Sequence, residues 1–282
     1  MQERSYSDKV FVAKENLLEI KGHLEDLGII SEAHLRELAD VLALEYVDHF
    51  RVDKIIENFS LDSRERAILS MAISKAPDLS VDLLPFDDVQ SPPAEPMTAY
   101  FRNSISDLAF SIFSREIKDL RATYLDSLFA CSEDVYSGTS DFCMLPILDY
   151  NDGDMWSVRR LIDKHELSIV MTLDLPTSSD ESNFVRFALL SRELHAYKGA
   201  DRLRVTALFN DASELSGFID GCCELDAIAL TVSNLPRAFS DQVAFDIDFD
   251  VSSASTKAMG IFFSLFYPRT TIGGIYRHLK TM

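Results

Sequence analysis

The sequence lacks the features that assign a chain directly to several large classes of protein. Only 27 of its 282 residues are Lys or Arg, against 46 Asp or Glu, which gives a formal net charge of −19. Neutralising many phosphates requires a surplus of basic side chains, so we exclude broad, sequence-independent binding of nucleic acids. The most apolar run, Ala258 to Tyr267, has ten residues. A membrane-spanning helix needs roughly twenty, so we expect no membrane span.

Cysteine motifs and glycine motifs are equally scarce. The four cysteines form no CxxC pair and no Cys/His metal spacing, and the N-terminus has no apolar signal-peptide region. We therefore expect free thiols, including the adjacent Cys222 and Cys223, in a cytoplasmic protein. The sequence contains no GxGxxG, P-loop or GxSxG motif, which disfavours a dinucleotide site, a P-loop nucleotide site and a hydrolase nucleophile elbow.

Helical periodicity dominates the first 140 residues. Apolar residues recur at helical spacing in two segments before residue 45, and a capping box at Asp62 and Glu65 predicts the start of a third helix. Residues 85–96 contain four prolines and predict a loop, and residues 97–131 read as a further helical block. We therefore expect residues 1–140 to form a helical bundle.

From residue 141 onward, predicted strands alternate with predicted helices. The predicted helices cover residues 155–165, 183–199 and 212–223, and a last helix is expected near the C-terminus, with Gly273 and Gly274 in a turn between helices. Five short apolar runs predict the strands: residues 142–150, 167–176, 203–211, 225–234 and 243–250. Crossovers of this length favour parallel pairing. We expect an α/β fold with an N-terminal all-α region: residues 141–282 form a doubly wound, mostly parallel five-stranded sheet of flavodoxin-like or Rossmann-like type.

Ligand sites of open parallel sheets lie at the carboxyl ends of the strands. The residues that we expect to line such a crevice are Asp149, Asp152, Asp154, Trp156, Asp174 and Asn210. The carboxylates of Asp149, Asp152 and Asp174 suit Mg²⁺, which prefers oxygen ligands. The indole of Trp156 could stack on a planar ligand. The alternative is structural: acidic residues here would cap helices at their positive N-termini, and Trp156 would pack a helix onto the sheet.

Two charge patterns near the C-terminus concern surfaces. Alternation in residues 243–250 places three Asp on one strand face, which indicates either an edge strand protected by charge or a ladder of metal ligands. The last 32 residues carry no acid and four basic side chains among many aromatics. They are expected either to pack into the core as a final helix or to dock on an acidic surface, of this chain or of a partner.

Three stretches carry a resemblance to a known family. They are the helix Arg115–Thr123, the strand at residues 144–150, and the strand–helix rhythm from Phe184 to residue 232. Over residues 97–235 the chain resembles bacterial regulators built on a cobalamin-binding-type module, such as the photosynthesis antirepressors of purple bacteria and their haem-sensing relatives. The resemblance implies a helical bundle followed by an α/β sensor domain that takes a tetrapyrrole. The family's cobalamin-ligating histidine loop is replaced here by residues 151–154, so histidine-ligated cobalamin is not expected.

These observations together predict a non-enzymatic, signal-responsive regulator without catalytic residues. It would act through a protein partner, as a monomer or a homodimer, with a degenerate sensor domain; a tetrapyrrole and Mg²⁺ are the cofactors considered, and neither is assigned. One alternative is a receiver-like domain that responds through Asp149 or Asp174. The other is a metal-dependent enzyme that uses Asp149, Asp152, Asp154 and Asp174.

Overall fold

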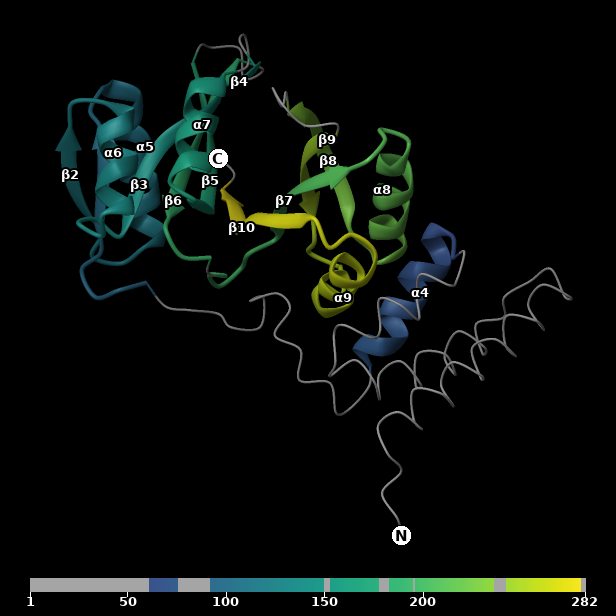
Figure 1. Cartoon of the computed structure of the whole chain (residues 1–282). Coiled ribbons are helices and arrows are strands. Elements are labelled where there is room, and N and C mark those ends of the chain that lie inside the picture. Colours follow the sequence, from purple (N-terminus) through teal and green to yellow (C-terminus); the bar gives the residue numbers. More distant parts are fainter. Residues whose placement is uncertain are drawn as a thin grey trace, which may run out of the picture. The chain divides into compact units, whose positions relative to one another are not determined.

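The computed structural model describes residues 61–75, 92–149, 153–177, 183–194, 196–235 and 242–279 (Figure 1). The chain divides into a first unit, residues 1–84 and 207–270, and a second unit, residues 85–206 and 271–282. Two of the three crossings between the units fall in strands, β7 (Arg202–Phe209) and β10 (Thr270–Leu279). The two helices predicted before residue 45 lie outside the described residues.

The second unit is built on a mixed sheet with the strand order β2-β1-β3-β6-β5-β10. Its further strands are β1 (Met97–Phe101), β2 (Arg121–Leu125), β3 (Phe142–Asp149), β4 (Gly153–Asp154), β5 (Ser168–Pro176) and β6 (Phe184–Ser191). Strand β1 runs parallel to β2 and β3, and β10 runs parallel to β5. Strand β6 is antiparallel to both of its neighbours, β3 and β5. The carboxyl ends of β1, β3, β5 and β10 therefore share one edge of the sheet.

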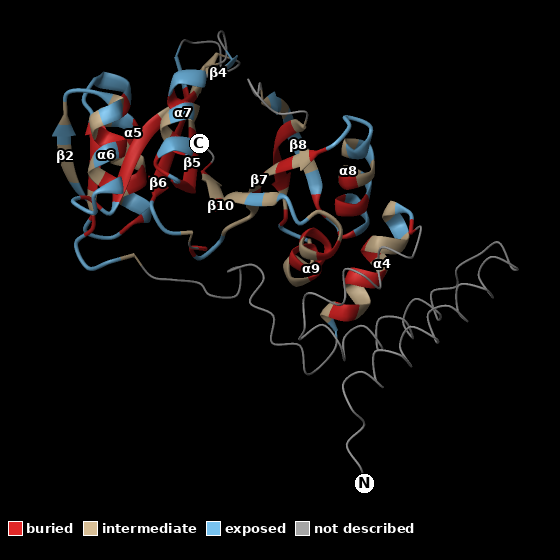
Figure 2. Ribbon diagram, viewed as in Figure 1, coloured by how far each residue is buried: buried red, intermediate tan, exposed pale blue. Residues whose placement is uncertain are grey.

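Helices cover both faces of this sheet. Helix α5 (Ser104–Glu116) buries Phe113 against one face, and α6 (Leu128–Tyr136) and α7 (Trp156–Lys164) bury Val135 and Val158 against the other. Because both faces are covered, the central strands are buried along most of their length, as Figure 2 shows in red.

The first unit contains α4 (Ser63–Ser74), α8 (Glu214–Glu224), β8 (Ile228–Leu235), β9 (Val243–Asp250) and α9 (Thr256–Phe266). From β7 to β10 the elements follow the βαββαβ order of ferredoxin-like motifs. Contacts among aromatic rings dominate its core: Phe218 stacks on Phe263 with ring centroids 5.4 Å apart, and Tyr267 meets Phe218 edge-on at 4.9 Å.

The capping box of α4 is confirmed. Glu65 N donates to the Asp62 carboxylate at 2.8 Å, and Asp62 N donates to the Glu65 carboxylate at 2.8 Å. The free thiols are also confirmed among the four cysteines, of which Cys223 is exposed and the other three are buried. No helix in the described ranges is long and apolar enough to cross a membrane.

The predicted doubly wound, mostly parallel five-stranded sheet after a helical bundle is wrong. Residues 97–131, expected to be helical, contain β1 and β2 on either side of α5, and residues 183–199 contain β6 instead of a helix. Both errors have the same cause. Strands buried on both faces, such as β1 and β6, show no two-residue alternation, so their apolar runs resemble parts of a helix.

Strand β9 is not at the edge of the sheet, where the alternating Asp residues suggested it would be. It lies between β7 and β8, and Asp246 and Asp248 are buried. Thr231 Oγ1 donates to Asp248 Oδ2 at 3.0 Å. The edge strand is β8 instead, and its residues Ile228 and Val232 are exposed. The predicted final helix, α9, is packed into the core with seven buried residues.

Gly273 and Gly274 lie in β10 and not in the predicted turn between helices. A Cβ atom on Gly274 would lie 2.6 Å from the Ile169 carbonyl oxygen and 2.8 Å from the Ile169 nitrogen, so β10 approaches β5 more closely than a side chain allows. The glycine is therefore required for strand pairing at this position.

We expect Gly274→Ala to lower the free energy of unfolding by about 1–3 kcal/mol, because the new methyl group overlaps the Ile169 backbone, which cannot move aside as a side chain would. Gly273→Ala is the matched control, since its nearest neighbours are atoms of Arg204 at 3.6 Å. Urea unfolding of both variants measures the difference. Equal effects of the two substitutions would contradict the close-approach explanation.

Candidate functional site

The predicted crevice residues are distributed over both units. Asp149 ends β3 and Asp174 lies in β5, near the shared carboxyl edge of the second unit. Trp156 is the first residue of α7, and its side chain is 45% exposed. Asp154 belongs to β4, where its backbone is paired with Leu148.

The structure does not bring the two remaining predicted residues into this site. Asp152 and the side chain of Asp154 lie outside the described part of the chain. Asn210 belongs to the first unit, where its side-chain oxygen accepts a hydrogen bond from Arg269 Nη1 at 3.1 Å. Within the described residues, no group of three or more His, Cys, Asp or Glu side chains is placed to hold a metal ion.

Asp174 forms a bidentate ion pair with Arg186. Arg186 Nε donates to Asp174 Oδ1 at 2.6 Å, and Arg186 Nη2 donates to Oδ2 at 2.8 Å. The two side chains are only about a quarter exposed, and the residues lie directly opposite each other on β5 and β6. This geometry is the strong, orientation-specific form of an Arg–carboxylate contact.

His278 of β10 completes this cluster. Its Nε2 lies 3.8 Å from Asp174 Oδ2, and its Nδ1 shares a hydrogen bond of 2.9 Å with Thr172 Oγ1. Burial lowers the pKa of His278, and the charges of Arg186 and Arg202 lower it further, against the opposing effect of Asp174. The lowered pKa favours the neutral imidazole at pH 7.

An apolar pocket of about 330 Å³ lies at the same edge of the sheet. Its apolar walls come from the end of β1, from β3, from β6 and from the start of α6, and are formed by Phe101, Met144, Pro146, Phe187 and Leu128. Its polar lining is confined to the N-terminal ends of two helices and consists of Asn103, Ser106 and Ser127. The pocket therefore combines an apolar body with one polar side.

The polar side consists of helix caps. The Asn103 side chain accepts from Ile105 N at 3.0 Å and Ser106 N at 2.8 Å, which fixes the first turn of α5. Ser127 Oγ accepts from Ala130 N at 3.0 Å and does the same for α6. Both helices therefore direct their positive N-terminal ends toward the pocket.

A second contact network fixes α5 to the end of β1. The Tyr100 hydroxyl donates to Asp107 Oδ1 at 2.8 Å, and Arg102 Nε donates to Asp107 Oδ2 at 3.2 Å. These hydrogen bonds, with that from Tyr100 the stronger influence, lower the pKa of Asp107. The Arg102 guanidinium also lies 4.7 Å from the centre of the Tyr124 ring. These contacts join the end of β1 to the first turn of α5 and to Tyr124 of β2. They therefore fix the side of the pocket that Phe101 and Asn103 form.

The fold resembles that of known enzymes. The sequence matches no family model, and no curated protein matches it. Among solved structures, a prephenate dehydratase from Streptococcus mutans is similar with 14% identity and a TM-score of 0.54, covering 66% of this chain and 100% of its own. A quorum-quenching acylase matches with 17% identity and a TM-score of 0.52, covering 65% of this chain and 95% of its own.

A third match is the prephenate dehydratase of Arthrobacter aurescens in complex with L-Phe, with 14% identity and a TM-score of 0.50, covering 64% of this chain and 90% of its own. At these identities the likeness concerns the fold alone. It nevertheless corrects the resemblance to cobalamin-binding-type regulators, which is wrong. The expectation of a non-enzymatic signalling or transcription regulator is overturned with it, because these three similar structures are those of enzymes.

Sequence reasoning missed Arg186 and His278, because their segments were assigned to a helix and to the end of a helical tail. One signal was present for Arg186. Residues 177–183 are rich in Ser, Asp and Asn and follow a predicted strand, so they indicate a turn between two strands. A hairpin reading of residues 168–191 would have placed Arg186 on the strand next to Asp174.

The neutral state of His278 predicts a pH dependence of stability. The unfolded chain protonates this imidazole near its ordinary pKa of 6.5, whereas the folded chain does so only at lower pH. Unfolding therefore takes up a proton, and stability falls as the pH drops below about 6.5. We expect the wild type to lose more unfolding free energy than His278→Asn between about pH 7.5 and about pH 5.5. Identical slopes in chemical denaturation would contradict this assignment.

Proposed function

We propose that the second unit binds a small carboxylate with a cyclic apolar body in the carboxyl-edge pocket and acts on it as an enzyme. The observation that carries the proposal is the pocket itself: an apolar cavity of about 330 Å³ whose polar side is made by the N-terminal ends of α5 and α6. A cavity of this size lies at the lower end of the range for small-molecule sites.

The walls of the pocket fit a ring. Phe101 and Phe187 supply aromatic surface, and Met144 adds a side chain that adapts to the shape of a ligand. No charged side chain is among the described residues that line it. A ligand of neutral apolar surface would therefore displace water without leaving a buried charge unpaired.

The polar side of the pocket fits an anion. The first backbone N–H groups of a helix have no acceptor within the helix, and the helix dipole places positive charge there. Two such ends, capped by Asn103 and Ser127, contribute to one pocket. Asn103 and Ser127 already accept from Ile105 N, Ser106 N and Ala130 N, so the dipoles of the two helices provide the attraction for a small carboxylate here.

The structural relatives support the enzyme part of the proposal. Two of them are prephenate dehydratases, and one of these is in complex with L-Phe. Prephenate and phenylalanine are both carboxylates built on a six-membered carbon ring, so they belong to the ligand class that the pocket suggests. Loss of water and carbon dioxide from a prephenate-like compound, which makes its ring aromatic, is the first reaction to test. We also propose a cytoplasmic location, which the free cysteines support.

The proposal predicts that 3-phenylpropionate binds the full-length chain and that its uncharged analogue 3-phenylpropan-1-ol binds at least about tenfold more weakly, since only the carboxylate gains charge-assisted hydrogen bonds. Leu128→Trp should abolish binding by filling the pocket. Leu108→Trp, on the exposed side of α5 and outside the pocket, is the matched control. Isothermal titration calorimetry measures all four cases.

Prephenate and L-phenylalanine are titrated in the same way, and prephenate turnover is followed by the absorbance of the aromatic product. Equal affinity for the acid and the alcohol would refute the anion site. Binding that survives Leu128→Trp would refute the location. Binding without turnover of prephenate would reject dehydration of that compound as the reaction while leaving the ligand class standing.

A further inference from the structure

His165 lies in a slot between two aromatic rings of the second unit. It directly follows the last residue of α7, and its ring stacks on Tyr136 of α6 with the centroids 5.2 Å apart. The ring of Phe129, near the start of α6, lies 5.8 Å from it on a tilted plane. His165 is only 4% exposed, although Phe129 and Tyr136 are 42% and 49% exposed. The imidazole therefore attaches the end of α7 to α6.

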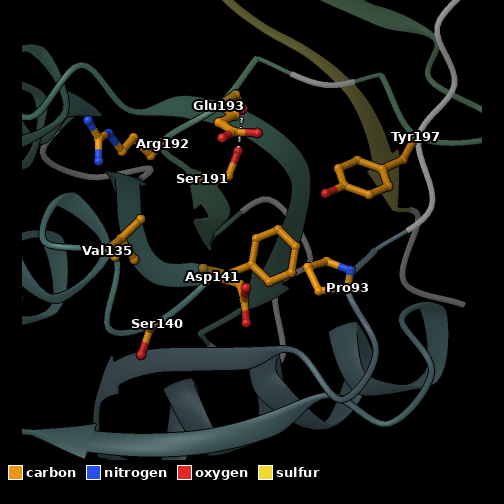
Figure 3. Close-up of a pocket in the computed structure, with 10 residues that line it drawn as sticks. Pro93, Val135, Ser140, Asp141, Ser191, Arg192, Glu193 and Tyr197 are labelled. Carbon is orange, nitrogen blue, oxygen red and sulfur yellow. Dashed lines mark hydrogen bonds between the residues drawn. The ribbon is translucent and has the colours of Figure 1, made fainter.

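Two cations already flank this slot. Lys164 Nζ lies 4.6 Å from the centre of the Phe129 ring, and Arg192 Cζ lies 5.7 Å from the centre of the Tyr136 ring. Arg192 also borders a pocket of about 400 Å³ at the amino edge of the sheet, where Figure 3 shows its guanidinium turned away from Tyr197. A third positive charge, on the imidazole between the two rings, would be repelled by both cations.

The enclosed side of the imidazole has no hydrogen-bond partner. Among the described residues, none donates to His165 Nδ1 or accepts from it. A neutral imidazole can carry its one N–H on Nε2, whereas a protonated ring carries an N–H on each nitrogen. Protonation inside the slot would therefore bury an N–H without an acceptor. Burial, and then the charge of Lys164, lower the pKa of His165 against the opposing effect of Glu133.

Glu133 offers the protonated ring a partner at the surface. It lies on the face of α6 that carries Phe129 and Tyr136, four residues after the first and three before the second. Glu133 is exposed, and no described residue forms a hydrogen bond or an ion pair with its carboxylate. A ring that leaves the slot would exchange an enclosed, unpaired N–H for a charge-assisted hydrogen bond.

The turn that carries His165 is strained. The next residue, Glu166, has a φ of 51°, in the left-handed region that favours glycine. The Glu166 N–H reaches the Asp163 carbonyl only at 3.4 Å. A strained residue and a long hydrogen bond make this turn depend on the packing of His165, so it is the part of α7 that opens first when the ring leaves the slot.

We propose that residues 164–167 form a pH-sensitive switch: as the pH falls below neutral, His165 takes up a proton, leaves its slot and pairs with Glu133. The charged groups on the three segments around the ring act in the same direction. Lys164 of α7 and Arg192 of the loop after β6 repel the imidazolium inside the slot, and Glu133 of α6 attracts it outside. The end of α7 is then released from α6. The switch uses no residue of the carboxyl-edge pocket, so it is independent of the proposed function.

The test uses the full-length chain. NMR with nitrogen-labelled histidine follows each imidazole, and the signals absent from His165→Asn belong to His165. We expect them to titrate below the ordinary pKa of 6.5. Hydrogen exchange of the amides of residues 164–167, corrected for the intrinsic effect of pH, should rise at least about fivefold from about pH 7.5 to about pH 5, because opening takes up a proton.

His165→Phe keeps a ring in the slot that cannot titrate, so this rise should stay below about twofold. Glu133→Gln removes the surface partner and should reduce the rise by about twofold. His278→Asn, which removes another buried histidine, is the matched control and should leave it unchanged. A His165 pKa at or above 6.5, or an equal rise in His165→Phe, overturns the switch, and an unchanged rise in Glu133→Gln overturns the pairing with Glu133. The pKa is measured on the wild type, so the test does not depend on the folding of a variant.

Discussion

Strand β6 lies antiparallel between β3 and β5, and the arrangement of side chains in the sheet of the second unit depends on how it pairs with these two strands. Its register places Arg186 opposite Asp174 on one side and Phe187 opposite Pro146 on the other. A slip by one residue would turn Arg186 toward the α5 core and Phe187 toward Asp174, since neighbouring side chains of a strand point to opposite faces. Because the slip would bury the unpaired charge of Arg186 in that apolar core, it is excluded, and the native register fixes the ion pair and the pocket wall together.

The sequence predicted the elements whose signal is local. The Asp62–Glu65 capping box marks the first residues of α4, and the strands β3, β5, β7, β8 and β9 correspond to the apolar runs. The local pattern did not predict β1 and β6 as strands. Both of their faces are buried, so their apolar residues do not alternate with polar ones. The pattern also failed at β10, whose two glycines suggest a turn until the close approach of Ile169 is known. That approach joins residues about a hundred positions apart, and no window of sequence contains it.

For the candidate site too, sequence order predicted some features and others required the strand pairings. The rule that ligands lie at carboxyl strand ends depends only on the order of elements, and it directed attention to the edge that holds Asp149 and Asp174, where the proposed pocket also lies. The partners of Asp174 could not be deduced in that way. Arg186 requires the hairpin register, and His278 requires the β5–β10 pairing across the sheet. Asn210 was assigned to this edge because β7 was taken as a strand of the same parallel sheet, whereas residues 207–209 belong to the first unit.

The direction of the helices places opposite ends of their dipoles at the two edges of the sheet in the second unit. Helix α5 follows β1 and α6 follows β2, so both begin at the carboxyl edge, and α6 ends at the amino edge, where β3 starts. Their dipoles add positive potential at the first edge and negative potential at the second. Arg277, a basic residue of β10, is paired with Glu116 at 2.7 Å and does not cancel this difference. A chain with a net charge of −19 can thus attract an anion at a site without basic side chains, because fixed backbone dipoles act locally where the net charge is screened by salt.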